Sequence, residues 1–225
     1  MSYECQIVVD FEFNPTDREY RGLLRNEIIE IGAIKLNSCL EEIGRFSCLV
    51  KPEFAAHIDS RITKLTGIRD EDVREAACFA DALQLFAAWA GPARCRVLSW
   101  SDSDLIQLED ECWAKEIEFP AVFSRWMDFQ LVWQRIIHYP ARMRLSLKMA
   151  ADMAKLGQDS RLAHRALYDT EITTQLLRLT RDREYIRDVA VAKSLVSTEV
   201  HHSSCSIGAA CGDALSSLMA RLQTA

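Results

Sequence analysis

The chain has 225 residues, of which 49% are hydrophobic and 27% are charged. This length suits one substantial core with a small appendage, and the composition excludes disordered and fibrous proteins. No stretch is apolar enough to cross a membrane and no secretory signal is evident, so we expect a cytoplasmic protein without membrane contact. The net charge of −6 excludes a generally basic surface. Any nucleic-acid binding must therefore depend on local basic residues, stacking and metal ions.

Three strands are predicted at the start of the chain. β-Branched and aromatic residues are concentrated in residues 5–13, and two similar runs occupy residues 27–36 and 42–50. These runs predict three antiparallel strands, with a polar loop over residues 14–26. After a mixed segment, apolar residues near helical spacing predict one helix over residues 70–90, which a Gly-Pro pair ends.

Helices predominate in the second half of the chain. A short apolar run predicts a strand over residues 95–100, and helical spacing predicts helices over residues 104–115, 129–137, 146–156 and 165–179. Three strands followed by alternating helix and strand indicate an α/β protein. The order is compatible with a ribonuclease-H-like mixed sheet, antiparallel in its first three strands and flanked by helices.

Two carboxylates interrupt the first predicted strand. Asp10 and Glu12 are two residues apart, so their side chains leave the strand on the same face. Burying paired negative charge is costly unless a cation shares the site. The pair therefore favours a metal ion. Glu27 and Glu30 lie close to this motif on the next predicted strand and are interpreted as strand-face charges.

Two further features could complete such a site. Asp169 lies on the same helix face as the apolar stripe that begins at Ile172, an unexpected place for a carboxylate. His164 lies five residues earlier, and histidine can act as a general base near neutral pH. Asp104 follows the strand over residues 95–100, at the end of a strand where α/β proteins often place function.

Each of these acids has an alternative interpretation. Asp104 could be a first-turn acid of its helix, and Asp102 competes with it for the place near the strand end. We favour Asp104, because its spacing to Gln107 and Leu108 is the better fit to the family that the motifs are shown below to resemble. A histidine such as His164 would by itself be a structural residue more often than a base; its spacing to Asp169 favours the functional role.

In this order, the motifs resemble those of the DEDDh group of the DnaQ-like 3′→5′ exonuclease superfamily, over about residues 5–180. Asp-Phe-Glu-Phe at 10–13 and Glu-Ile-Ile-Glu-Ile-Gly at 27–32 look like the branch of histone-mRNA and small-RNA 3′ exonucleases and of KapD-like bacterial exonucleases. Ile-Thr-Lys-Leu-Thr-Gly-Ile at 62–68 is similar to the family's segment that contacts the terminal nucleotide. Ala-His-Arg-Ala-Leu-Tyr-Asp at 163–169 is close to its third motif.

The resemblance implies two-metal hydrolysis of a phosphodiester to release 5′-mononucleotides. Asp10 would bridge both ions, with Glu12 and Asp169 completing one site and Asp104 supporting the other. His164 would deprotonate the attacking water. Carboxylate and water ligands are those that Mg²⁺ and Mn²⁺ prefer, so two ions of either metal are the expected cofactors.

The resemblance also implies which residues contact the substrate. Leu65 and Thr66, with the backbone and side chain of Phe11, would hold the 3′-terminal nucleotide; packing and a turn hydroxyl are the alternative roles of the first two. In the RNA-directed eukaryotic members an aromatic residue directly precedes the second-motif Asp. Here that position is Ser103, and Trp100 is the nearby aromatic candidate for substrate contact. The resemblance therefore does not imply that the residue before Asp104 stacks on a base in this chain.

Single-stranded 3′ ends are the expected substrate, with RNA favoured and DNA as the nearest alternative. Many proofreading or repair DNA exonucleases have Asp-x-Glu-Thr as their first motif, whereas this chain has Phe13 after Glu12. A rival of another class is a catalytically weak nucleic-acid-binding regulatory module on the same fold. A homodimer is compatible with the sequence, although no feature indicates one.

Residues 1–182 are predicted to form the exonuclease domain, and 183–225 a C-terminal extension. Apolar residues at helical spacing predict a short helix near the end of the extension that packs on the core or on a partner. His201, His202, Cys205 and Cys211 match no common structural zinc pattern, so we interpret them as part of a polar connection. The eight cysteines lack the pattern of a disulfide framework, and most are expected to be buried or half-buried thiols.

Overall fold

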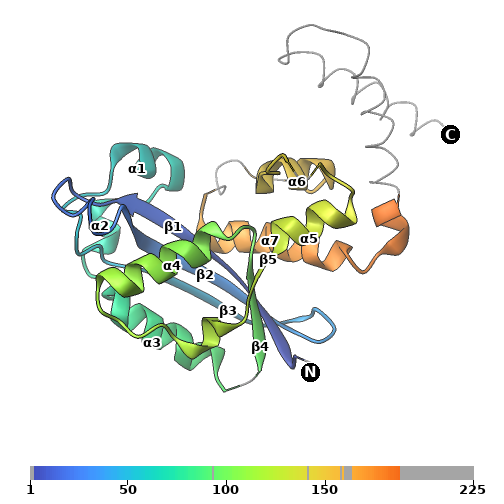
Figure 1. Ribbon diagram of the computed structural model, residues 1–225, viewed down its shortest axis with the longest axis horizontal. Helices are drawn as coiled ribbons and strands as arrows, with labels where there is room; N and C mark the ends of the chain where they lie inside the picture. Colours follow the sequence, from blue (N-terminus) through green and yellow to red (C-terminus); the bar gives the residue numbers. More distant parts are fainter. Residues whose placement is uncertain (1–2, 93, 141, 158, 160–163, 188–225) are drawn as a thin grey trace, which may run out of the picture.

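A five-stranded mixed sheet forms the centre of the protein (Figure 1). The computed structural model describes residues 3–92, 94–140, 142–157, 159 and 164–187. The sheet has the order β3-β2-β1-β4-β5 and consists of β1 (Cys5–Pro15), β2 (Asn26–Asn37), β3 (Glu42–Leu49), β4 (Cys95–Ser99) and β5 (Trp126–Asp128). The first three strands are antiparallel, as predicted, and β4 and β5 run parallel to β1.

Helices cover both faces of this sheet. The helices are α1 (Ser60–Thr66), α2 (Asp70–Val73), α3 (Phe79–Ala90), α4 (Ser103–Ala114), the 3₁₀ turn η1 (Ala121–Ser124), α5 (Phe129–Ile136), α6 (Leu147–Met153) and α7 (Ala166–Leu179). Helices α3 and α4 lie on one face and α5, α6 and α7 on the other (Figure 1). No helix in the described part of the chain combines the length and hydropathy that a membrane span requires. The predicted fold class is confirmed.

The central strand β1 contributes to two separate cores. Ile7, Val9 and Phe11 pack with α3 and α4, whereas Val8 packs with α5, α6 and α7. This division follows from the alternation of side chains along a strand. Because both faces of β1 are covered, its sequence is almost continuously apolar. A charged side chain on the α7 face of β1 is consequently placed between the sheet and a helix.

The helix predicted over residues 70–90 is two helices, α2 and α3, and this prediction was wrong for the residues between them. The backbone of Ala77 forms a parallel bridge with Val50, just after β3. Lys51 donates its N–H to the Ala77 carbonyl at 2.9 Å. Pairing with a segment distant in the sequence therefore overrides the local helical pattern here.

Three elements, α1, η1 and β5, were not predicted. Helix α1 begins after Asp59, whose side chain accepts the Arg61 N–H at 2.8 Å, and it ends at Gly67, where φ is +79°. These are ordinary helix-end signals, but they enclose only seven residues, too few for a clear helical periodicity. Strand β5 has three residues and exists through its pairing with β4.

The cysteine expectation holds in part. Cys5 and Cys95 are partners in the parallel register of β1 and β4, with Cα atoms 4.5 Å apart, and they form a disulfide. For this pair the expectation of thiols was wrong, because the register that brings the two cysteines together is a property of the fold. Among the described residues the four other cysteines are free thiols: Cys39, Cys48, Cys78 and Cys112.

The start of the predicted C-terminal extension lies against the core. Residues 183–187 are helical, and the Tyr185 hydroxyl donates to the Ala154 carbonyl at 2.7 Å, next to α6. The rest of the extension lies outside the described residues, including His201, His202, Cys205 and Cys211, as does its predicted helix. The division into a domain and an extension therefore stays a prediction.

Candidate active site

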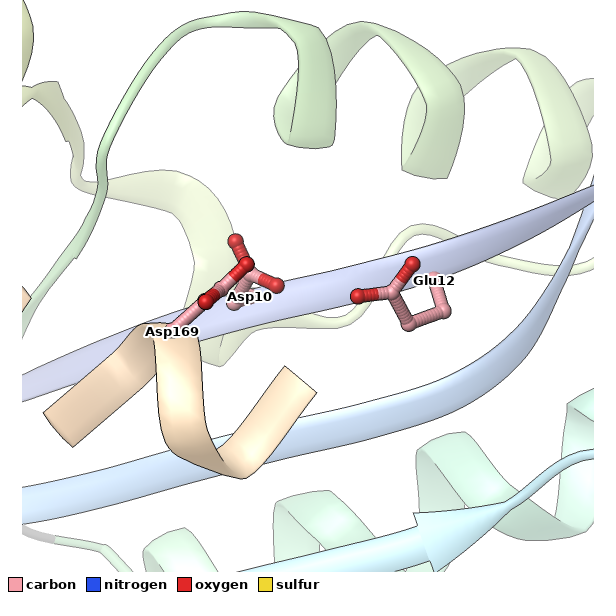
Figure 2. A group of neighbouring side chains, drawn as sticks. All are labelled: Asp10, Glu12 and Asp169. Carbon is pink, nitrogen blue, oxygen red and sulfur yellow. The ribbon is translucent and has the colours of Figure 1, made fainter. Parts of the chain in front are cut away.

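Three of the predicted acids lie together on one face of the sheet. Asp10 and Glu12 leave β1 on the same face, and Asp169 comes from the first turn of α7 to lie beside Asp10 (Figure 2). One carboxylate oxygen from each of the three residues lies within 4.8 Å of the other two. These are the residues for which the sequence predicts a metal site, and the fold brings them from two distant segments into one group.

A glycine on β2 permits α7 to come this close. Gly32 is the cross-strand partner of Asp10, and the backbone at the start of α7 lies directly over it. A Cβ atom at Gly32 would lie 2.3 Å from the carbonyl carbon of Ala166 and 2.3 Å from the nitrogen of Leu167, far inside any allowed contact. Only glycine fits here. The close approach brings Asp169 down to the carboxylates of β1.

The fourth predicted acid, Asp104, lies at the open edge of β1. Pairing of β1 with β4 ends at Val8 and Leu98, so the N–H of Phe11 faces no strand partner on that side. Asp104 accepts this N–H at 3.1 Å from the first turn of α4. Within the described residues Asp104 is not one of the three clustered acids, although it is close enough for its charge to raise the pKa of Asp10.

The rival acid Asp102 faces elsewhere. It accepts a hydrogen bond from Arg144 at 3.1 Å, in an exposed ion pair. The geometry thus agrees with the preference for Asp104. Asp102 also serves as a useful comparison, since it is an acid near the same strand end without a partner in β1.

The carboxylates of the site destabilise one another's charged forms. Burial, followed by the charges of Asp104 and Asp169, raises the pKa of Asp10 well above its usual range. Burial, followed by Asp169 and Glu30, raises the pKa of Glu12 to about 8. Burial also raises the pKa of Asp104 to about 7, although the Phe11 N–H opposes the shift. A site with this much buried negative charge and only oxygen donors fits a hard divalent cation.

His164 occupies the turn that leads into α7. Its side chain is exposed, and its φ is +64°, a left-handed conformation that is uncommon for a residue other than glycine. Burial raises the pKa of Asp169, and the charge and backbone N–H of His164 act against that increase. The predicted base therefore lies next to the predicted metal ligands, in a backbone conformation often found at functional sites.

Two of the predicted substrate contacts need correction. The side chain of Trp100 is 6% exposed, its indole N–H donates to the Leu145 carbonyl at 3.0 Å, and its ring lies 6.1 Å from that of Phe129. Trp100 is therefore a core residue. Phe11 packs in the core on the opposite face of the sheet from Asp10, and its N–H is taken by Asp104. Its side chain is not available to a nucleotide.

The two residues predicted on α1 differ in availability. The Thr66 hydroxyl donates to the Ile62 carbonyl at 2.9 Å and accepts the Ile68 N–H at 3.0 Å, so it closes the end of the helix. This is the turn role that the sequence left open for Thr66. Leu65 is 48% exposed and presents an apolar side chain to solvent. Of the pair, Leu65 is the one with a free surface.

Glu27 and Glu30 were wrongly interpreted as strand-face charges, because both are fully buried. Glu27 lies 2.9 Å from the Nζ of Lys115 and accepts the N–H groups of Glu53 and Phe54. Glu30 lies beside the site and is bonded to the start of α7. A sequence signal did exist for Glu30: its neighbours on both sides in β2 are apolar, and a buried acid in such a strand must have a partner.

The pKa shifts predict how the stability of the metal-free protein depends on pH. The folded-state pKa values of Glu12 and Asp104 exceed their usual values of 4.5 and 3.8. Ionisation therefore costs more in the folded state than in the unfolded state, and stability is lost as the pH rises towards the folded pKa values. In EDTA we expect Tm to fall between about pH 5.5 and about pH 8.5, and Mg²⁺ to raise Tm far more at the higher pH. Thermal denaturation at both pH values, with and without Mg²⁺, checks this. An equal Mg²⁺ effect at both would contradict it.

Comparisons with known proteins identify relatives of this chain. The family model described as Exonuclease (RNase_T) matches residues 7–177. ERI1 exoribonuclease 2 of Mus musculus is 30% identical over 156 residues, which are 59% of this chain and 22% of that protein. The 3′-5′ exoribonuclease 1 of Mus musculus is 25% identical over 167 residues, 70% of this chain and 47% of that protein. The chain thus matches only about a fifth to a half of the length of these relatives.

Solved structures share the fold. The nuclease domain of 3′hExo, a DEDDh family member bound to rAMP, has a TM-score of 0.71 at 22% identity, over 80% of this chain and 94% of that one. E. coli exonuclease I in complex with a dT13 oligonucleotide has a TM-score of 0.59 at 15% identity, over 80% of this chain and 42% of that one. The family match covers most of the sequence, from β1 into α7, and includes all five predicted catalytic residues. The chain therefore belongs to the exonuclease (RNase_T) family.

Proposed function

We propose that this protein is a metal-dependent 3′→5′ exonuclease that shortens single-stranded nucleic acid from its 3′ end, with residues 1–182 as the catalytic unit. The observation that carries the proposal is the convergence of Asp10, Glu12 and Asp169, with His164 in the turn before α7. Family membership supports this reaction class. We include a cytoplasmic location in the proposal: four free cysteines among the described residues favour it, and the Cys5–Cys95 disulfide is the feature that opposes it.

The donor set supports two Mg²⁺ or Mn²⁺ ions as cofactors. Asp10, Glu12 and Asp169 would hold one ion, and Asp10 and Asp104 would hold the other. Such ions supply positive charge to the attacking and leaving oxygens of an in-line displacement. From the turn before α7, His164 takes the proton of the attacking water. Leu65 contacts the 3′-terminal nucleotide from α1.

The substrate class rests on the relatives' names. Two of them are called exoribonucleases, which favours RNA, and E. coli exonuclease I in complex with dT13 keeps DNA as the alternative. The two aromatic side chains predicted to contact substrate, Trp100 and Phe11, are both in the core. The proposed site thus has no base-stacking residue at either of these positions. We therefore expect the 3′-terminal base to be bound more weakly than an aromatic stacking residue would bind it, whichever base it is.

A direct assay tests this function. The purified protein is incubated with 5′-labelled single-stranded RNA, or with DNA of the same sequence, in Mg²⁺, Mn²⁺ or EDTA. We expect a ladder that shortens from the 3′ end, 5′-mononucleotides as products, no shortening in EDTA, and faster loss of RNA than of DNA. If the protein is folded and binds metal but shortens neither strand, the exonuclease proposal fails for these substrates. A regulatory binding module then becomes the better account.

We expect Asn14→Ala to weaken substrate binding more than chemistry. Asn14 is fully buried at the end of β1; its Oδ1 accepts the Asp59 N–H at 2.8 Å, and its Nδ2 donates to the His57 carbonyl at 3.2 Å. These bonds position the start of α1, which carries Leu65. Losing them should raise KM for a single strand by about tenfold, equivalent to about 1.4 kcal/mol, with little change in kcat.

Steady-state kinetics on one RNA strand measures both parameters of the Asn14→Ala variant. The matched control is Asn37→Ala, which removes an asparagine that bonds the backbone of the β2–β3 turn, where α1 is not involved. The control should keep the wild-type KM. An unchanged KM in Asn14→Ala would show that α1 does not hold the substrate.

A further inference from the structure

Both carboxylate oxygens of Glu30 accept hydrogen bonds from the start of α7. Its side chain is 1% exposed. Arg165 donates to it from Nε, at 3.2 and 3.0 Å to the two carboxylate oxygens, and from Nη2 at 2.6 Å. The N–H of Ala166 donates to the same carboxylate at 3.0 Å. One buried carboxylate thus binds both a guanidinium and the first N–H of the helix.

This carboxylate acts as the cap of α7. Arg165 is the N-cap residue, and within the described residues its own side chain makes no capping bond. The first N–H groups of a helix need acceptors, and a negative charge near them is favourable. Glu30 supplies both from β2. The first N–H group of the helix that carries Asp169 is therefore bonded to a residue of the sheet.

The position of Glu30 in the sheet relates it directly to the site. In the register of β1 and β2, Glu30 is the partner of Glu12, and Gly32 is the partner of Asp10. Glu30 and Gly32 together form what we call the α7 seat, since one bonds the backbone at Ala166 and the other gives it room. The two residues of the seat are thus opposite two of the three clustered acids.

We propose that Glu30 is a positioning residue for the active site, acting through the start of α7. It fixes the backbone from Arg165 to Ala166, and this backbone sets where His164 and Asp169 stand relative to Asp10 and Glu12. The inference rests on the proposed function for its effect on catalysis. Its effect on the metal site can be measured without any turnover.

The main alternative is that Glu30 matters only through its charge. It adds negative charge to the site and raises the pKa of Glu12, while Arg165 lowers it. Glu30→Asp separates the two explanations, because aspartate keeps the charge but is shorter by one methylene and cannot keep all the bonds to Arg165 and Ala166. Glu30→Gln removes the charge at nearly constant size. Arg165→Lys keeps the positive charge but loses the two-pronged contact.

The control is another ion pair between α7 and the sheet. Arg45 on β3 bonds Glu171 on α7 in a partly exposed pair, one turn of the helix beyond the seat. Arg45→Gln weakens the anchoring of α7 without touching its first residues. Metal affinity is measured by titration with Mn²⁺ in the absence of substrate. Steady-state kinetics on a single RNA strand gives kcat and KM, and thermal denaturation gives Tm.

For Glu30→Asp, Glu30→Gln and Arg165→Lys we expect Mn²⁺ affinity or kcat to fall about 10- to 100-fold. The KM of these variants should stay within about threefold of the wild-type value. Arg45→Gln should keep the wild-type Mn²⁺ affinity, kcat and KM. Wild-type Mn²⁺ affinity and kcat in a folded Glu30→Asp would overturn the proposal, as would an equal loss in Arg45→Gln. Should Glu30→Gln fail to fold, the two conservative variants decide. Should the wild type cleave nothing, the exonuclease proposal fails on its own and the Mn²⁺ titration still tests Glu30.

Discussion

Asp10→Asn is expected to abolish exonuclease activity and to stabilise the metal-free protein at the same time. Asp10 is the acid through which both proposed ions would be held, and loss of several kcal/mol of transition-state stabilisation lowers the rate by about 10³-fold or more. The same side chain carries a charge that burial and four neighbouring acids disfavour. Replacing it with a neutral group removes that penalty, so Tm in EDTA near pH 8 should rise.

The two effects are measured by strand shortening in Mg²⁺ and by thermal denaturation in EDTA. Asp102→Asn is the matched control, because Asp102 lies near the same strand end but pairs with the exposed Arg144. It should keep activity, metal response and Tm close to wild type. Residual activity of Asp10→Asn near the wild-type level, or a fall in its metal-free Tm, would contradict this assignment of the site.

Gly32→Ala is expected to have the second large effect. The added methyl group would lie 2.3 Å from backbone atoms of Ala166 and Leu167, which cannot move without the rest of α7. Overpacking of a core usually costs about 1–3 kcal/mol and occasionally more, and a contact with backbone belongs at the upper end. Because α7 carries Asp169, displacing this helix to accept the methyl group should also remove most of the protein's exonuclease activity.

Chemical denaturation and the strand assay measure the two losses in Gly32→Ala. Gly22→Ala is the control, since a Cβ atom there meets nothing within 4 Å in the described part of the chain. It should match the wild type in both measurements. A stable, active Gly32→Ala protein would show that α7 does not need to contact β2 so closely, and the account of how Asp169 reaches the site would be wrong.

The sequence predicted those parts of the site that depend on local periodicity. Asp10 and Glu12 share a face because strands alternate, and Asp169 was recognised because a carboxylate stood on an apolar helical stripe. The order of the motifs then indicated that these segments meet. The first three strands were also predictable, since each has a long run of β-branched and aromatic residues.

Other features depend on partners far away in the chain and were missed for that reason. The role of Trp100 is decided by Leu145, whose carbonyl binds its indole N–H. Glu30 looked like a surface charge because its partner, Arg165, is 135 residues away. The break between α2 and α3 depends on pairing of Ala77 with Val50. In each case the deciding contact forms only in the folded chain.

The central claim is that Asp10, Glu12 and Asp169 form a divalent metal site, and calorimetric titration with Mn²⁺ near neutral pH tests it most directly. We predict that the wild type and Asp102→Asn bind Mn²⁺ with equal affinity and release protons as the raised-pKa acids ionise, whereas Asp10→Asn loses at least one binding event. Equal Mn²⁺ binding by the wild type and Asp10→Asn would contradict the claim.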